Sequence, residues 1–118
     1  MNIKTTPWGE TQGETEIADG IVSVHTASHG GFNLSLDRLI EMQDNYPVLA
    51  KFQPFAGQFW YEEDCDWAIV CLAFSEFFET EDIKAAVKTV RQVASWEGSR
   101  DTWQPILDWL PDSEFSSF

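Results

Sequence analysis

The clearest alternation of apolar and polar positions lies in the C-terminal third of the chain. Apolar residues recur there every three or four positions, which places them on one face of a helix. The residues of this stripe are Ile83, Val87, Val90 and Ala94. Thr80 is suited to cap the start of the run, Glu81 and Asp82 fill its first turn, and Gly98 is suited to end it. The pattern predicts a helix from Thr80 to Gly98.

A shorter apolar pattern follows and predicts a final helix from about Thr102 to Pro111. Its inward residues are Trp103, Ile106, Leu107 and Leu110. Residues 112–118 are expected to fray, because chain ends without an apolar run are poorly held.

The middle of the chain holds a nearly continuous apolar run, WAIVCLAF, from Trp67 to Phe74. Periodicity alone does not separate a buried helix from a central strand here. A helix is favoured because Trp67, Val70, Cys71, Phe74 and Phe78 recur at helical spacing and because acids precede the run, where the helix dipole favours them.

The N-terminal half reads as strands and turns. Residues 21–27 form a β-branched run typical of a strand, with Gly30 and Gly31 expected to end it. Residues 5–20 suggest turns joined to a short extended segment, and residues 46–60 a packed loop leading into a short strand around 59–62.

A short helix through Met42 is expected between these segments, capped by Asn33 or Ser35. Leu36, Leu39 and Ile40 are expected on its buried stripe, and Tyr46 with Pro47 at its end. Together these elements predict a single α+β domain over residues 1–118, with a small antiparallel sheet from the N-terminal half packed against helices from the C-terminal half, residues 81–111 being helical.

The charge balance narrows the classes of partner. The chain has 20 acidic and 7 basic residues, a net charge of −13. Direct binding to nucleic acid or to an anionic membrane is not expected, since both would repel such a protein. We also expect a cytoplasmic protein with reduced Cys65 and Cys71, because no signal region and no apolar stretch of about 20 residues is present.

The acids concentrate between Phe52 and Ile83, where neither Lys nor Arg occurs. Uniform negative charge over a segment that can also form a packed core suggests a surface that binds a basic partner. An aromatic side chain would add cation–π contact. The predicted contact residues are Glu62, Glu63, Asp64, Asp66, Glu76, Glu79, Glu81, Asp82 and Trp60. The plainer alternative is a helix N-terminus with a solvated acidic face.

Two other functions stay open. A metal-dependent or small-ligand enzyme would use His29 with Cys65 or Glu63, although His25 and His29 lie in a segment that is not helical and Ser28 to Gly31 reads as a turn. An accessory interaction module would instead use an apolar contact through Phe52, Phe55 and Trp60. No catalytic residue, metal or cofactor is predicted for the preferred, non-enzymatic interpretation.

Three strings, TPWG at 6–9, TASHGGFNLS at 26–35 and WYEEDCDWAIV at 60–70, resemble an uncharacterised domain family of proteobacterial plasmid, phage and mobile-element proteins. The resemblance covers roughly residues 5–80. It implies an origin in a mobile element, but the family has no established activity to carry over. By analogy, the chain is similar to small acidic anti-CRISPR or anti-restriction inhibitors, many of which occupy a basic nucleic-acid-binding groove of a host protein. That analogy implies DNA mimicry.

Overall fold

The computed structural model describes residues 5–118 and has the α+β fold that the sequence predicts. Two antiparallel sheets form the N-terminal part. A two-stranded sheet pairs β1 (Thr5–Thr6) with β2 (Gly9–Glu10). A four-stranded sheet orders its strands as β3 (Gly13–Ala18), β4 (Ile21–His25), β5 (Gly30–Leu34) and β6 (Trp60–Glu62).

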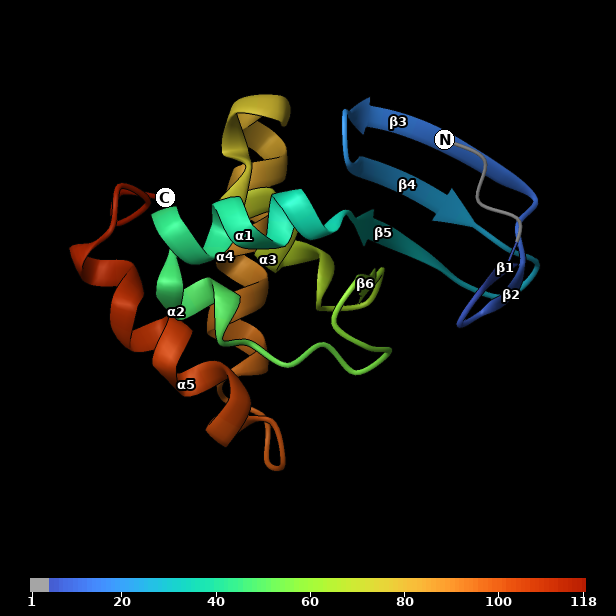
Figure 1. Cartoon of the computed structure of the whole chain (residues 1–118). Coiled ribbons are helices and arrows are strands. Elements are labelled where there is room, and N and C mark those ends of the chain that lie inside the picture. The colour runs from blue at the N-terminus through green and yellow to red at the C-terminus, as the bar shows by residue number, and fades with distance from the viewer. Residues whose placement is uncertain (1–4) are drawn as a thin grey trace.

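The helices lie to one side of the larger sheet, closest to β5 and β6 (Figure 1). Two of them, α1 (Leu36–Asn45) and α2 (Pro47–Ala50), connect β5 to β6. The others follow β6 and are α3 (Trp67–Ala73), the 3₁₀ turn η1 (Ser75–Phe77), α4 (Thr80–Val93), α5 (Arg100–Trp109) and the 3₁₀ turn η2 (Leu110–Asp112). Within residues 5–118, no helix has the length and apolar character to cross a membrane.

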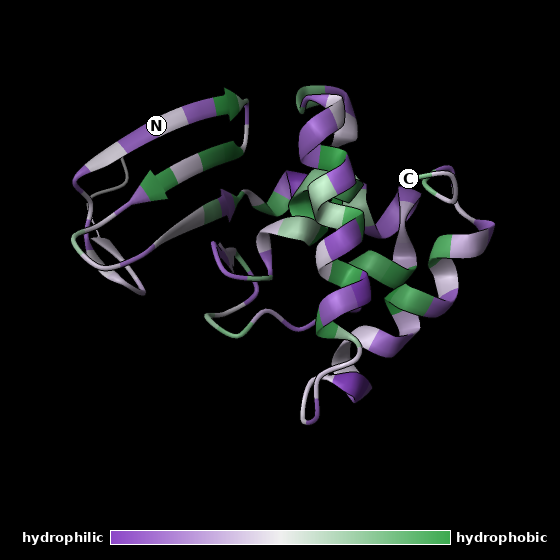
Figure 2. Ribbon diagram, turned by 180° about the vertical axis from the view of Figure 1, so that it is seen from behind, coloured by the Kyte–Doolittle hydropathy of each residue, from purple (hydrophilic) through white to green (hydrophobic). Residues whose placement is uncertain are grey.

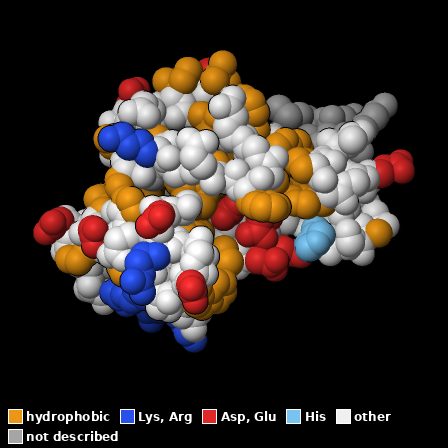
Figure 3. Space-filling view, turned by 90° about the horizontal axis from the view of Figure 1, so that it is seen from below, with side chains coloured by type: hydrophobic (Ala, Val, Ile, Leu, Met, Phe, Trp, Pro, Cys, Tyr) orange, Lys and Arg blue, Asp and Glu red, His pale blue; other side chains and the backbone are white. Residues whose placement is uncertain are grey.

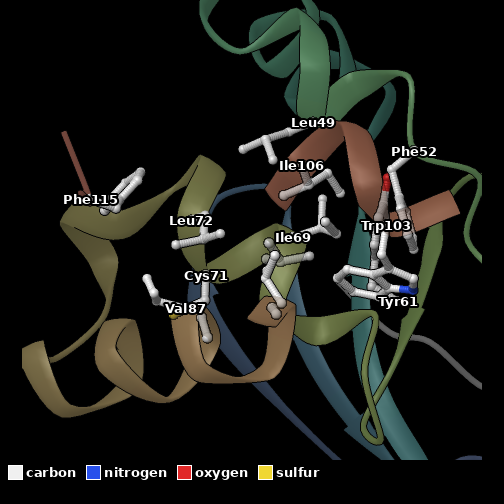
Figure 4. Close-up of a cluster of buried hydrophobic side chains, with 14 of the residues drawn as sticks. Leu49, Phe52, Tyr61, Ile69, Cys71, Leu72, Val87, Trp103, Ile106 and Phe115 are labelled. Atoms are coloured by element: carbon white, nitrogen blue, oxygen red, sulfur yellow. The ribbon is translucent and has the colours of Figure 1, made fainter. Parts of the chain in front are cut away.

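Helix α3 forms the centre of the core, which confirms the helical interpretation of the apolar run. Every residue from Ala68 to Leu72 is fully buried. Side chains from α2, α4, α5 and β6 surround this helix, including Leu49, Val87, Ile106 and Tyr61 (Figure 4). The helix ends at Ala73 with Phe74 as its C-cap, and η1 follows it, so the segment does not continue as one helix through Phe77 as its pattern suggested.

Gly30 and Gly31 do not end the strand region but begin β5. Gly31 pairs with Glu62 of β6, and a Cβ atom at Gly31 would lie 2.4 Å from the carbonyl oxygen of Tyr61. Gly31 is therefore required because the backbone of β6 lies so close to it, a role that glycine often has inside strands.

Helix α1 has a predicted cap and ends before Tyr46 as predicted, but it differs from its prediction in its buried face. Ser35 is the N-cap and its Oγ accepts the N–H of Arg38, whereas Asn33 lies inside β5. Leu36 and Ile40 are exposed, and the helix is buried at Met42. Of the predicted stripe, Leu39 packs against the core, whereas the prediction was wrong for Leu36 and Ile40, because the buried face turns toward Met42.

Helix α4 carries the amphipathic alternation that the sequence predicts (Figure 2). Its N-cap is Glu79, whose backbone N–H donates to the carboxylate of Asp82 at 3.2 Å, so Thr80 is the first helical residue. The helix ends at Val93, before Gly98, because the next amides, of Ser95 and Trp96, bond to carbonyls only three residues back. Helix α5 likewise begins at Arg100, two residues before its predicted start.

The C-terminal tail packs onto the core, contrary to the expectation that residues 112–118 fray. Phe115 is buried, and its ring lies 6.0 Å from the ring of Trp109. The backbone oxygen of Phe118 also accepts a hydrogen bond from Arg91 at 2.7 Å. Tertiary contacts supply the order that the short polar sequence lacks on its own.

Arg38 joins three parts of the fold. Its Nε donates to the carbonyl oxygen of Asp19 in the β3–β4 turn at 2.8 Å, and its Nη1 lies 2.9 Å from the carboxylate of Glu41. Its guanidinium group also lies over the rings of Phe74 and Phe77, with 5.5 and 5.1 Å to their centroids. This one side chain thus fixes the sheet turn, α1 and η1 relative to one another.

Candidate partner-binding surface

The three strings that carry the family resemblance meet at one end of the larger sheet. The rings of Trp8 and Trp60 pack edge to face with centroids 5.7 Å apart. A Cβ atom at Gly31 would lie 2.7 Å from the ring of Trp8, so the indole covers this glycine. Trp60 is therefore partly buried by Trp8, and both rings have a packing role in this junction.

The turn between β4 and β5 is held by its own hydrogen bonds. The hydroxyl of buried Thr26 lies 3.0 Å from the carbonyl oxygen of His29 and 3.3 Å from that of Trp8, and it accepts the N–H of His29 at 3.2 Å. A side chain that satisfies the backbone in this way is typical of a structural turn. The structural turn therefore spans residues 26–29, and the predicted turn at 28–31 is wrong for Gly30 and Gly31, which belong to β5.

His29 lies beside Glu63, with 3.9 Å between Nδ1 and Oε1. Both side chains are about half exposed, at 51% and 53%, so the pair sits on the surface. Within residues 5–118, no group of three or more His, Cys, Asp or Glu side chains is arranged to hold a metal ion. Of the suggested chemical partners of His29, Glu63 is adjacent, whereas Cys65 lines a hollow with Asp66 and Phe55.

The carboxylate of Glu62 is hydrogen-bonded to the backbone of the turn that follows it. It accepts the N–H groups of Asp64, Cys65 and Asp66 at 2.8, 2.8 and 3.1 Å. These bonds satisfy amides that enter α3 and would otherwise lack partners, as a helix cap does. Glu62 therefore holds the turn before α3, which the sequence did not reveal. Glu63 and Asp64 remain exposed.

Asp66 is buried, with 5% of its surface exposed. Its Oδ2 accepts the N–H of Phe55 at 3.0 Å. The pKa of Asp66 is raised to about 6, chiefly by burial; the hydrogen bond from Phe55 opposes this shift and the charge of Glu62 adds to it. The prediction that Asp66 belongs to an open acidic patch was wrong, because the loop at 52–55 covers it.

The second group of predicted acids consists of exposed residues around the start of α4: Glu76, Glu79, Glu81 and Asp82. Below, these four are called the α4 acidic group. Within it, Asp82 accepts a backbone N–H, and Glu81 lies 3.5 Å from Lys84.

The α4 acidic group does not extend the first group of acids. The first group precedes α3 and the α4 group follows it, so a seven-residue helix of about 10 Å separates them. The view from below shows a cluster of carboxylates beside a histidine, as expected from the contact of Glu63 with His29 (Figure 3). The surface thus carries two acidic regions, not one.

A hollow of about 260 Å³, which no local sequence pattern predicts, lies between the 52–55 loop, the 62–66 turn and the connection from α4 to α5. Two of its lining residues are unusually exposed aromatic side chains, Phe55 at 95% and Trp96 at 51%. Phe55 stands between Pro54 and the pair Ala56–Gly57, which is a signal for a protruding turn. Nothing in the local sequence pairs Phe55 with Trp96.

The fold and these surfaces define a small acidic α+β domain with exposed carboxylates and exposed aromatic side chains. The chain belongs to the family described as Domain of unknown function (DUF7007), which matches residues 1–112. The match continues through α5, beyond the residues 5–80 on which the resemblance in the sequence rests. No curated protein and no solved structure matches the chain.

Proposed function

We propose that this domain is a non-enzymatic binding module that attaches through exposed carboxylates to a basic surface of another protein. The observation that carries the proposal is the α4 acidic group. Its four acids lie within seven residues and are all exposed, and one of them, Glu81, forms an ion pair with Lys84. Side chains of this kind attract a basic partner over about 8 to 10 Å at physiological ionic strength.

Neighbouring acids on the same side of the molecule add to this field. Glu41 and Glu76 line one hollow of about 380 Å³ together with Tyr46. The hydroxyl of Tyr46 is hydrogen-bonded to Glu114. Burial raises the pKa of Tyr46 to about 12, with further contributions from Glu114 and Glu76. Carboxylates from α1, η1 and the tail thus gather near one tyrosine, where Arg38 offsets Glu41.

The narrower form of the proposal concerns the partner and the setting. The domain would act in the cytoplasm of a host cell for a phage or other mobile element, by occupying the nucleic-acid-binding groove of a CRISPR effector or a restriction component as a DNA mimic. This form rests on the analogy with small acidic inhibitors. The physical basis of such mimicry is that carboxylates on a rigid surface displace the counterions of a basic groove as phosphates do.

The test is capture from a bacterial lysate on immobilised domain at about 50 mM and about 200 mM salt, followed by challenge of the captured protein with duplex DNA. The test variant replaces the α4 acidic group by Gln and Asn. A matched control neutralises four exposed acids elsewhere, namely Asp44, Glu97, Asp108 and Asp112. Both variants have the same net charge, so a difference between them reports position.

We expect a salt-sensitive, nucleic-acid-binding partner that duplex DNA displaces and that the α4 variant no longer captures, while the control variant still does. Neutral replacements are chosen because lysines would also oppose the dipole at the start of α4. Capture that both variants retain equally, or that DNA does not displace, would remove the acidic surface from the explanation.

A second candidate is docking through apolar contact, which the exposure of Phe55 favours. Of the other two residues predicted for such a contact, Phe52 is buried and Trp60 packs against Trp8. The apolar alternative therefore reduces to Phe55 and its new neighbour Trp96. A partner whose capture does not change with salt and is lost with Phe55→Ala would support it.

A further inference from the structure

We propose that the hollow between Phe55 and Trp96 receives an arginine side chain from a partner protein, with the carboxylate of Asp66 as its counter-ion. The inference rests on the proposed function, because it assigns a specific contact within the binding of a basic protein. It also adds a site, formed by the 52–55 loop, the turn before α3 and the α4–α5 connection, which none of these segments suggests alone.

The hollow has the size of a single side chain. Its volume of about 260 Å³ is below the range of roughly 300 to 1,000 Å³ that is typical of drug-sized ligands. Phe52 and Trp103 contribute to its lining and pack against each other with ring centroids 4.8 Å apart. A firmly packed wall of this kind favours insertion of one group over adaptation to a large ligand.

Asp66 gives the hollow an unbalanced negative charge. Asp66 has only 5% of its surface exposed and lines the hollow, yet the hydrogen bond from Phe55 occupies only one of the roughly four acceptor positions of its carboxylate. The residues that line the hollow include no Lys or Arg. A buried carboxylate without a cation is costly, and a guanidinium group fits a carboxylate with two parallel N–H bonds.

Glu62 is a weaker candidate for the same role, although it also lines the hollow. Its two carboxylate oxygens already accept three backbone N–H groups. It contributes negative potential to the hollow, while Asp66 has the acceptor capacity that a new donor needs.

The exposed aromatic side chains favour arginine over a compact cation. Phe55 is 95% exposed and Trp96 is 51% exposed, although burial of either ring in water-free contact would be favourable. The planar guanidinium group stacks on aromatic faces while it bonds to a carboxylate, which an ammonium group does less well. Phe55 and Trp96 thus supply apolar faces beside the one buried acid.

The experiment uses the full chain and three capped tripeptides as probes, acetyl-Gly-X-Gly-amide with X as arginine, citrulline or lysine. Citrulline has nearly the shape of arginine and no charge. Binding is followed by amide and indole NMR shifts at Phe55, Asp66 and Trp96. The variants are Asp66→Asn, which keeps an acceptor for the N–H of Phe55, and Asp64→Asn, which removes one exposed charge two positions away.

We expect the arginine peptide to shift these three residues saturably and the citrulline peptide to leave them unchanged. Asp66→Asn should weaken arginine binding by about tenfold or more, and Asp64→Asn by less than about twofold. Equal binding of arginine and citrulline, equal binding of arginine and lysine, or equal losses in the two variants would each overturn the assignment.

Arginine binding should also weaken as the pH falls below about 6, where Asp66 becomes protonated. The titratable groups beside Asp66 are Glu62, Cys65 and Tyr61, all from the same segment. The lining residues from the 52–55 loop, α4 and α5 carry no titratable group. A binding constant for arginine that stays constant from pH 7 to pH 5 would contradict the role of Asp66.

The outcome separates this inference from the proposed function. If the α4 acidic group governs capture of a basic protein but the arginine peptide does not bind, the proposed function stands and the arginine site does not. If the peptide binds as expected but no salt-sensitive partner is captured, the site stands and the proposed function does not.

Discussion

The backbone N–H of Phe55 donates a hydrogen bond of 3.0 Å to Oδ2 of Asp66, eleven residues further along the chain. This bond ties a protruding loop to the start of the central helix. It also explains why one acid of the run 62–66 is buried while its neighbours Glu63 and Asp64 are exposed. The same bond therefore links the protruding loop to a buried carboxylate.

Protonation of Asp66 should stabilise the fold. Its pKa is raised from 3.8 to about 6, so the folded protein binds the proton more tightly than the unfolded chain does. This contribution is fully present below pH 3.8 and is lost as the pH rises through about 6. It amounts to something on the order of 3 kcal/mol.

Urea unfolding of the wild type and of Asp66→Asn between pH 4 and pH 7 measures this contribution. We expect the free energy of unfolding of the wild type to fall relative to that of the variant across this interval. The comparison cancels the repulsion among the other acids, which both proteins share. A constant difference across the interval would show that Asp66 titrates normally.

Replacement of Glu62 by Ala should lower the free energy of unfolding by about 1 to 3 kcal/mol, because the backbone N–H groups of residues 64–66 would lose their acceptor. Glu63→Ala is the matched control and should stay within about 0.5 kcal/mol, since this side chain is half exposed. Chemical unfolding at pH 7 measures both. Equal effects would mean that Glu62 is as dispensable as its neighbour.

Arg38→Lys should destabilise the protein although it keeps the charge. Lysine cannot bond to the Asp19 carbonyl and the Glu41 carboxylate in the same geometry, nor stack over Phe74 and Phe77 as a planar group does. We expect a loss of about 1 to 3 kcal/mol in urea unfolding. Arg100→Lys, at an exposed position, should change little, and a similar small change at Arg38 would contradict its joining role.

Phe115→Ala should cost about 3 to 5 kcal/mol, the range typical of a large aromatic side chain removed from a core. The ring is buried and contacts Trp109 and Phe118. Ser116→Ala, one position away and exposed, is the control. Thermal unfolding that does not distinguish the two variants would restore the expectation of a frayed tail.

Local periodicity predicted the elements that have a regular apolar spacing within their own sequence. The helices α3, α4 and α5 and the strand β4 follow from apolar spacing, because a helix or strand must bury one face. The ends of these elements were less accurate. Helix α4 ends at Val93 and not at Gly98, since the amides of Ser95 and Trp96 bond to carbonyls three residues back.

The candidate site could be predicted only in part. Composition indicated an acidic surface, and the α4 acidic group is exposed as that interpretation requires. The run of acids did not predict that the carboxylates of Glu62 and Asp66 are hydrogen-bonded inside the fold, because these bonds depend on which backbone N–H groups lie near each of them. The meeting of Trp8, Gly31 and Trp60 depends on pairing of β5 with β6 across two intervening helices.

The sequence by itself determined the α+β class, the order of the main helices and the excess negative charge, because these depend on residue type and on spacing within a few positions. The tertiary structure alone decided which acids are open to solvent, which cap a turn and which lie buried beside Phe55 and Trp96. Those outcomes depend on the distance between segments as far apart in the sequence as Phe52 and Trp103, and chain packing, not local pattern, sets that distance.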